Sequence, residues 1–179
     1  MVLNDRLKQI NKEMEYASVQ DYLTELYNRR GFFEELFKMI HASENQNKYL
    51  TFLSIDMDGL KIINDTYGHN EGDFSLKALA SAIQNFARRN GICARYGGDE
   101  FVCAIITEQE SYFTPDIVRE RFQAAYEKNK ELSEKPYVIS ASIGCRCSKI
   151  DEHLALDELM HQADEDMYKD KLSRRKNRS

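Results

Sequence analysis

The chain has 179 residues, enough for one ordinary domain and an appendage. Hydrophobic residues make up 42% and aromatic residues 11%, so the chain can bury a core and is not disordered throughout. Its 25 Lys and Arg against 30 Asp and Glu give a formal charge of −5, which argues against a protein that coats nucleic acid. The longest apolar stretches, residues 49–55 and 101–106, are far shorter than the ~20 residues of a membrane span. Residues 1–6 also lack the layout of a signal peptide, so we expect a cytoplasmic protein without nucleic-acid partners or membrane insertion.

The N-terminal segment repeats apolar residues at alternating steps of four and three. These are Leu3, Leu7, Ile10, Met14 and Ala17. Such an a/d pattern is typical of a short coiled coil, although a helix that packs on its own domain has the same pattern. We therefore predict a linker or coiled-coil helix over residues 1–19 and a catalytic domain over residues 20–179.

The next segments alternate between helical and strand patterns. Residues 31–41 carry an apolar stripe at helical spacing, and residues 49–55 form a short apolar run rich in strand-forming residues. Residues 76–86 predict a second helix. Residues 92–95 and 101–106 are strand candidates, and the Gly-Gly turn between them favours a hairpin.

The last third of the chain continues the alternation. Pro115 is typical of the first turn of a helix that runs through Ala125. Residues 137–145 alternate like a strand, and residues 154–172 predict a final helix before a basic tail. This order of elements predicts an α/β (α+β) fold, with a mainly antiparallel sheet flanked by helices.

The four cysteines do not have the spacing of a metal site. Cys93 and Cys103 lie in apolar runs, and only one residue separates Cys145 from Cys147. A zinc site usually has two to four residues between paired cysteines. We predict four reduced thiols and no metal held by sulfur.

Acidic residues cluster where predicted strands end. Asp56 and Asp58 follow one strand, and Asp99 and Glu100 occupy the hairpin turn. Carboxylates at neighbouring strand ends can converge on a hard cation, and Mg²⁺ with nucleotide phosphates is the usual occupant of an all-oxygen site. Taken alone, however, the turn is more typical of a plain hairpin with a solvated acidic tip. The usual Gly-rich phosphate-binding motifs are absent from the chain.

Four sequence blocks together identify a family. Residues 95–101 read Arg-Tyr-Gly-Gly-Asp-Glu-Phe, and they follow blocks at residues 21–30 and 56–73 and precede one at 163–168. These blocks resemble, in order and spacing, the motifs of GGDEF domains, the bacterial diguanylate cyclases. The resemblance covers residues 21 to 175. It implies a nucleotidyl-cyclase-like palm that condenses two GTP into cyclic di-GMP and two pyrophosphate, with one GTP per subunit of a homodimer.

The resemblance also implies a metal site. Asp56, Asp99, Glu100 and the backbone carbonyl of Met57 match its ligands, and two Mg²⁺ (or Mn²⁺) ions are expected in each half-site. Asp99, Glu100 and Lys61 match the catalytic positions. Asp99 would help remove the proton of the 3′-hydroxyl, and Lys61 would stabilise charge on the phosphates.

Substrate-binding positions follow in the same way. Asn64, His69 and Asp73 match the guanine-binding block. Asp73 favours GTP because a carboxylate accepts from two neighbouring donors of guanine that adenine lacks. The remaining substrate positions leave room for the nucleotide or grip its outer phosphates: Gly97, Gly98, Lys171 and Arg175.

One family motif is incomplete. Members inhibited by their product carry R-x-x-D before the hairpin, and here Arg88 is present but Gly91 replaces the aspartate. The resemblance therefore implies weak feedback inhibition. A different functional class remains open, namely a non-catalytic GTP-binding or dimerisation output module of a sensor protein. In either case an upstream sensor domain or partner is expected.

Overall fold

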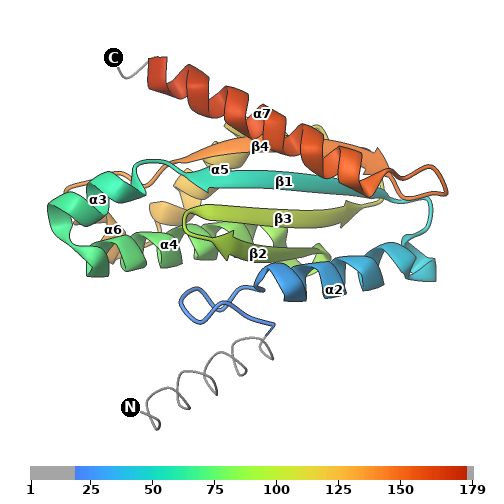
Figure 1. Cartoon of the computed structure of the whole chain (residues 1–179), viewed down its shortest axis with the longest axis horizontal. Helices are drawn as coiled ribbons and strands as arrows, with labels where there is room; N and C mark the ends of the chain where they lie inside the picture. Colours follow the sequence, from blue (N-terminus) through green and yellow to red (C-terminus); the bar gives the residue numbers. More distant parts are fainter. Residues whose placement is uncertain (1–18, 177–179) are drawn as a thin grey trace, which may run out of the picture.

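The computed structural model describes residues 19–176 as a four-stranded sheet with helices on both faces (Figure 1). The coiled coil predicted over residues 1–19 lies almost entirely outside the described residues. The strands are β1 Tyr49–Met57, β2 Gly91–Gly97, β3 Glu100–Thr107 and β4 Ala141–Lys149. Their order in the sheet is β2-β3-β1-β4, and all three ladders are antiparallel, as the sequence predicts.

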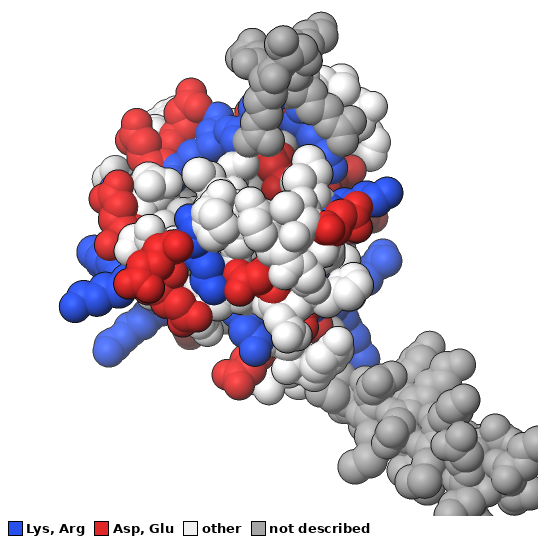
Figure 2. Space-filling view, turned by 90° about the vertical axis from the view of Figure 1, so that its left-hand side faces the viewer, with Lys and Arg blue, Asp and Glu red and all other residues white. Residues whose placement is uncertain are grey.

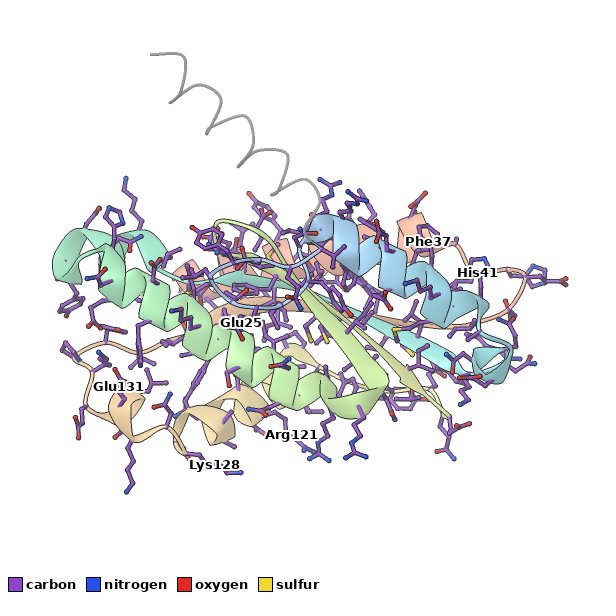
Figure 3. The ribbon with its side chains drawn as sticks, turned by 90° about the horizontal axis from the view of Figure 1, so that it is seen from below. Glu25, Phe37, His41, Arg121, Lys128 and Glu131 are labelled. Carbon is purple, nitrogen blue, oxygen red and sulfur yellow. The ribbon has the colours of Figure 1, made fainter. Side chains whose placement is uncertain are left out.

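Within residues 19–176, six α-helices flank the sheet. They are α2 Arg29–His41, α3 Leu60–Tyr67, α4 His69–Ala87, α5 Pro115–Tyr126, α6 Lys130–Ser133 and α7 Leu156–Lys176. The core residues of α4 and α5 cluster on one face of the sheet, whereas those of α2 and α7 cluster on the other. Seen from below, α2 and α4 lie on opposite sides of the β2 edge (Figure 3).

Strand β1 is apolar almost throughout because it is a central strand covered on both faces. Leu53 and Ile55 point into the α4–α5 core, and Leu50 and Phe52 point into the α2–α7 core. All four side chains are at most 2% exposed. The strand therefore ends at Met57 with its last residues held rigidly, which fixes the position of the acidic residues there.

Local signals in the sequence account for two helix starts. The Asn28 side chain accepts a hydrogen bond from the Gly31 backbone N–H at 2.9 Å and caps α2. Thr114 caps α5 in the same way, with Pro115 directly after it at the first helical position.

The predicted elements differ from the structure in two ways. The strand predicted over residues 137–145 begins only at Ala141, which pairs with Met57, the last residue of β1, and Tyr137 instead hydrogen-bonds Glu71 in α4. The short helices α3 and α6 have no counterpart among the predicted elements. Helix α3 has eight residues, of which only Ile63 is buried, so its apolar stripe is too short to recognise.

The cysteines are free thiols in the structure. Cys93 and Cys103 are cross-strand partners in β2 and β3, with sulfurs 3.6 Å apart in the core. Among the helices described, none is both long and apolar enough to cross a membrane.

Candidate active site

The end of β1 meets the β2–β3 turn. Asp56 is opposite Glu100 in the β1–β3 ladder, and the Met57 backbone N–H donates to the Asp99 carbonyl at 2.9 Å. Antiparallel pairing thus brings together residues that lie more than forty positions apart in the sequence. The pairing therefore places the backbones of Asp56, Met57, Asp99 and Glu100 next to one another.

Asp56 is a buried carboxylate with a cation beside it. The residue is 5% exposed, and its Oδ1 accepts a hydrogen bond from Lys171 Nζ of α7 at 2.7 Å. Burial raises the pKa of Asp56, the bond from Lys171 opposes that rise, and the neighbouring charges of Asp99 and Asp58 add to it. A carboxylate in this setting favours a positive partner, whether an ammonium or a metal ion.

The second aspartate of the pair has a different environment. Asp58 accepts hydrogen bonds from Ser140 at 2.9 Å and Ser142 at 2.7 Å, and Arg174 of α7 lies 3.1 Å from its Oδ2. Its backbone N–H also donates to the Ser140 carbonyl. Asp58 therefore joins the end of β1 to the start of β4 and the end of α7, a role that the sequence does not reveal.

Two glycines give the hairpin turn its backbone conformation, and an arginine side chain fixes the turn by hydrogen bonds. Gly97 and Gly98 have φ of +145° and +55°, which residues with a side chain rarely adopt. The guanidinium of Arg95 donates two hydrogen bonds to the Gly98 carbonyl, at 3.0 and 2.8 Å, and pairs with Asp21 at 3.3 Å. The turn backbone is thereby exposed but fixed.

The predicted base-binding residues come from α3 and α4. A Cβ at Gly72 would lie 1.9 Å from Asn64 Oδ1, so the two helices can approach this closely only because Gly72 has no side chain. Asn64 therefore lies against α4 at Gly72, the residue before Asp73. Asp73, His69 and Lys61 are exposed around this contact.

A second group of residues fixes the start of α4. Glu71 accepts hydrogen bonds from the Tyr137 hydroxyl at 2.5 Å and from Lys135 Nζ at 3.0 Å. The ring of Tyr137 also packs on Tyr67 of α3, with centroids 5.2 Å apart. This contact could not be predicted from the sequence, because nothing in the spacing of residues 71 and 137 links them.

Three predicted positions are either not described or lie away from the β1 end and the hairpin turn. Arg175 belongs to α7, but its side chain lies outside the described part of the structure. Arg88 and Gly91 lie at the far end of β2 from the Gly97–Gly98 turn, beside a separate cavity of about 280 Å³. Arg88 and Gly91 are therefore not part of the group formed by Asp56, Met57, Asp99 and Glu100, which we call the strand-end cluster.

The donors at the strand ends suit a hard divalent cation. Within residues 19–176, no three His, Cys, Asp or Glu side chains gather closely enough to form a complete metal site. Asp56, Asp99, Glu100 and the Met57 carbonyl offer only oxygen, and Mg²⁺ commonly takes one or two carboxylates and completes its shell with water and substrate phosphates. The residues present fit that mode of binding.

Acidic and basic side chains are interspersed over the end of the molecule that carries the hairpin turn and α3 (Figure 2). Next to Glu100, a cavity of about 270 Å³ lies between α7 and β1–β3, lined in part by Ser54, Tyr96 and Asp164. Of the residues predicted as metal ligands, only Glu100 lines this hollow.

An antiparallel α/β domain with paired carboxylates at the end of its central strand is the class that this fold and site define. The family model described as diguanylate cyclase, GGDEF domain, matches residues 18–177, and the chain belongs to that family.

Proteins similar to the chain include diguanylate cyclases and a solved GGDEF domain. The chain is 30% identical over 176 residues to diguanylate cyclase DgcP of Escherichia coli, covering 97% of this chain and 50% of that protein. It is similar to the crystal structure of diguanylate cyclase SiaD of Pseudomonas aeruginosa in complex with its activator SiaC, with TM-score 0.69, 26% identity and coverage of 96% and 66%. The coiled coil and GGDEF domain of DgcB of Caulobacter crescentus, solved with c-di-GMP, shares the fold at TM-score 0.68 and 23% identity, with coverage of 96% and 90%. The chain spans about half the length of DgcP, and less of several other curated relatives.

Proposed function

We propose that the chain is a diguanylate cyclase, which joins two GTP into cyclic di-GMP and releases two pyrophosphate. The observation that carries the proposal is the buried Asp56 carboxylate beside the turn that holds Asp99, with the cation of Lys171 on the same carboxylate. The names of the relatives support the same activity.

In the proposed reaction the 3′-hydroxyl oxygen of one GTP attacks the α-phosphorus of the other. The new P–O bond forms as the bond to pyrophosphate breaks, and the second bond forms in the same way with the roles exchanged. Asp99 accepts or relays the proton of the hydroxyl. Because each subunit holds one GTP, the active species is a homodimer.

Asp56, Asp99, Glu100 and the Met57 carbonyl are the groups that we propose hold two Mg²⁺ (or Mn²⁺) ions in each half-site. When bound, such ions neutralise the charge of the triphosphate. Lys171 lies at the same point, so its ammonium is positioned to exchange a carboxylate oxygen for a phosphate oxygen. Lys61 and Arg175 complete the proposed phosphate contacts.

Guanine is the base that we propose the site selects. Asp73 accepts from the ring N–H and the exocyclic amine of guanine, while Asn64 contacts the same base from α3. Gly72 supports this arrangement because it allows Asn64 to lie against α4. His69 belongs to the same block, and Gly97 and Gly98 leave space for the nucleotide at the turn.

The test is incubation of the purified chain with GTP and Mg²⁺ at high and low protein concentration, with products identified by mass. We expect cyclic di-GMP from GTP, no cyclic dinucleotide from ATP, and a rate per protein that rises with protein concentration because the half-sites must meet. Bound GTP without product, even at high concentration, would favour the non-catalytic GTP-binding module. A product that appears only when the chain is fused to a dimeric partner would show that activity depends on imposed dimerisation.

A further inference from the structure

Tyr137 contacts both of the helices that carry the proposed base-binding residues. Its hydroxyl donates to Glu71 Oε2 at 2.5 Å in the first turn of α4, and its ring packs on Tyr67, the last residue of α3, with centroids 5.2 Å apart. Asn64 precedes Tyr67 by about one turn of α3, and Asp73 follows Glu71 by two positions in α4. A side chain from outside these helices therefore holds one against the other.

The connection between α3 and α4 does not fix their relative placement by itself. Gly68 alone joins the two helices. Its φ is +93°, which residues with a side chain rarely adopt, and no side chain caps the start of α4. Because a single glycine permits many angles, contacts between the helices set their geometry. Those contacts include the approach of Asn64 to Gly72 and the bridge through Tyr137.

Lys135 strengthens the bridge at the same carboxylate. Its Nζ donates to Glu71 Oε1 at 3.0 Å and lies 4.3 Å from the centre of the Phe74 ring, three positions further along α4. The hydrogen bonds from Tyr137 and Lys135 lower the pKa of Glu71, whereas burial and the bond to Glu71 raise the pKa of Tyr137 to about 12. At neutral pH an ionised carboxylate thus accepts from a protonated hydroxyl, which is the pairing that forms a short, charge-assisted hydrogen bond.

The stretch that carries Lys135 and Tyr137 is anchored to the end of β1. Ser140 Oγ donates to the Asp58 carboxylate at 2.9 Å, and the Asp58 backbone N–H donates to the Ser140 carbonyl at 2.8 Å. Ile139, just before Ser140, is 3% exposed. The contacts of Glu71 therefore tie the start of α4 to a fixed point on the central strand.

We propose that Tyr137 and Lys135 are positioning residues for guanine recognition, which act through Glu71 to hold Asp73 of α4 in place relative to Asn64 of α3. Successive positions in an α-helix are about 100° apart, so the side chains of Glu71 and Asp73 leave α4 on nearly opposite sides. Glu71 can therefore be held from one side while Asp73 is exposed on the other. The inference rests on the proposed function, because it takes Asn64 and Asp73 as the base contacts.

The test compares two nucleotides that differ only in the exocyclic amine of the base. The probes are 3′-deoxy-GTP and the 3′-deoxy form of inosine triphosphate (ITP), which lack the attacking hydroxyl and so bind without reacting. Tyr137→Phe removes the hydroxyl and keeps the ring on Tyr67. We expect it to weaken binding of the guanine nucleotide about fivefold and that of the inosine nucleotide less than twofold, since the latter makes fewer bonds to Asp73. An equal loss for both nucleotides, as general destabilisation would cause, contradicts the proposal.

Further variants test the route through Glu71. Glu71→Ala should reduce the preference for guanine at least as much as Tyr137→Phe, and adding Tyr137→Phe to Glu71→Ala should cause no further loss. Additive losses would contradict the route. Lys135→Arg keeps a cation and should retain more of the preference than Lys135→Met. The matched control is Tyr112→Phe, whose hydroxyl also bonds to a glutamate, Glu110 at 3.4 Å, but at a 78% exposed position between β3 and α5. It should bind both nucleotides like the parent.

Hydrogen–deuterium exchange without nucleotide tests the positioning directly. Tyr137→Phe and Glu71→Ala should speed exchange of the amides of α3 and of the first turn of α4 several-fold, while those of β1 stay protected. Unchanged exchange in both variants would overturn the proposal. In cyclase assays Tyr137→Phe should raise the KM for GTP and leave kcat nearly unchanged. Absence of nucleotide binding by the parent would refute the proposed function and this inference with it, whereas binding by the parent with the same base preference in Tyr137→Phe would refute this inference alone.

Discussion

The ammonium of Lys171 lies 2.7 Å from the carboxylate of Asp56, and 115 positions separate the two residues in the sequence. The contact joins the end of the central strand β1 to the last turns of α7. One residue of the pair is a proposed metal ligand, and the other is a proposed phosphate contact. In the structure each neutralises the other, so Lys171 serves as the internal cation of the site.

Removal of that cation should destabilise the metal-free protein. We expect Lys171→Met to lower the free energy of unfolding by roughly 1–3 kcal/mol without divalent cations, because Asp56 then remains buried without a partner. Added Mg²⁺ should restore part of the loss. Thermal or urea unfolding with and without Mg²⁺ measures both effects. Lys169→Met is the control, since its side chain is 69% exposed and pairs with Asp166. If Lys171→Met and the parent had equal free energies of unfolding without divalent cations, this account of Asp56 would be contradicted.

Choice of base should depend on Asp73. We expect Asp73→Asn to raise the KM for GTP roughly 10- to 100-fold, since hydrogen bonds to a charged group contribute about 1.5–3 kcal/mol and each 1.4 kcal/mol is tenfold. The change in kcat should be smaller, because the base is remote from the reacting phosphorus. Steady-state kinetics separate the two parameters. Asp157→Asn, at an exposed position at the start of α7, controls for the loss of one charge. An unchanged KM for Asp73→Asn would remove Asp73 from the base contact.

Feedback by the product should be weak or absent. Gly91 stands where the inhibited members of the family have an aspartate, and the structure gives a packing reason why the site is not easily restored. A Cβ at Gly91 would lie 2.9 Å from the Ala104 carbonyl and 2.9 Å from the Ala87 methyl, so Gly91→Asp must displace β3 or α4. We expect initial rates to be insensitive to added cyclic di-GMP, and Gly91→Asp to unfold more easily than the parent. Inhibition by low-micromolar product would refute the first expectation.

The contacts of Tyr137 and Lys135 with Glu71 predict a pH dependence of stability. The hydrogen bond from Tyr137, and then that from Lys135, holds the pKa of Glu71 below its ordinary value of 4.5. A carboxylate with a lowered pKa contributes stability fully above its unfolded-state pKa and loses that contribution as the pH falls through the folded-state value. The difference in melting temperature between the parent and Glu71→Gln should therefore be constant above pH 4.5 and shrink below it.

Glu134→Gln, at an exposed position directly before Lys135, is the control for Glu71→Gln. Its melting temperature should follow that of the parent at every pH. A difference between the parent and Glu71→Gln that does not shrink at low pH would mean that ionisation of Glu71 contributes nothing to folding.

Elements with strong local signals could be predicted from the sequence. The apolar run of β1, the Gly-Gly hairpin and the Thr114-Pro115 helix start all lie where their residues indicate. The strand-end acids are neighbours along the backbone because antiparallel pairing places the β1 end beside the hairpin turn. In these places the local pattern and the overall fold favour the same conformation.

Contacts distant in sequence could not be predicted in the same way. Tyr137 alternates with its neighbours like a strand residue, yet its hydroxyl binds Glu71 and β4 starts only at Ala141, opposite the end of β1. The partners of Asp58 and Asp56 on α7 also depend on where that helix crosses the sheet. Alternation and spacing describe one segment at a time, so they give no information on such tertiary pairs.

The most direct test of the central claim is the initial rate of cyclic di-GMP formation from GTP as Mg²⁺ is titrated, for the parent, Asp99→Asn and Asp157→Asn. We predict no product without a divalent cation, a saturable rise for the parent and for Asp157→Asn, and a loss of at least 100-fold for Asp99→Asn with its fold intact by circular dichroism. Product formation by Asp99→Asn at the rate of the parent, or a rate independent of Mg²⁺, would contradict the assignment of the strand-end carboxylates as the catalytic metal site.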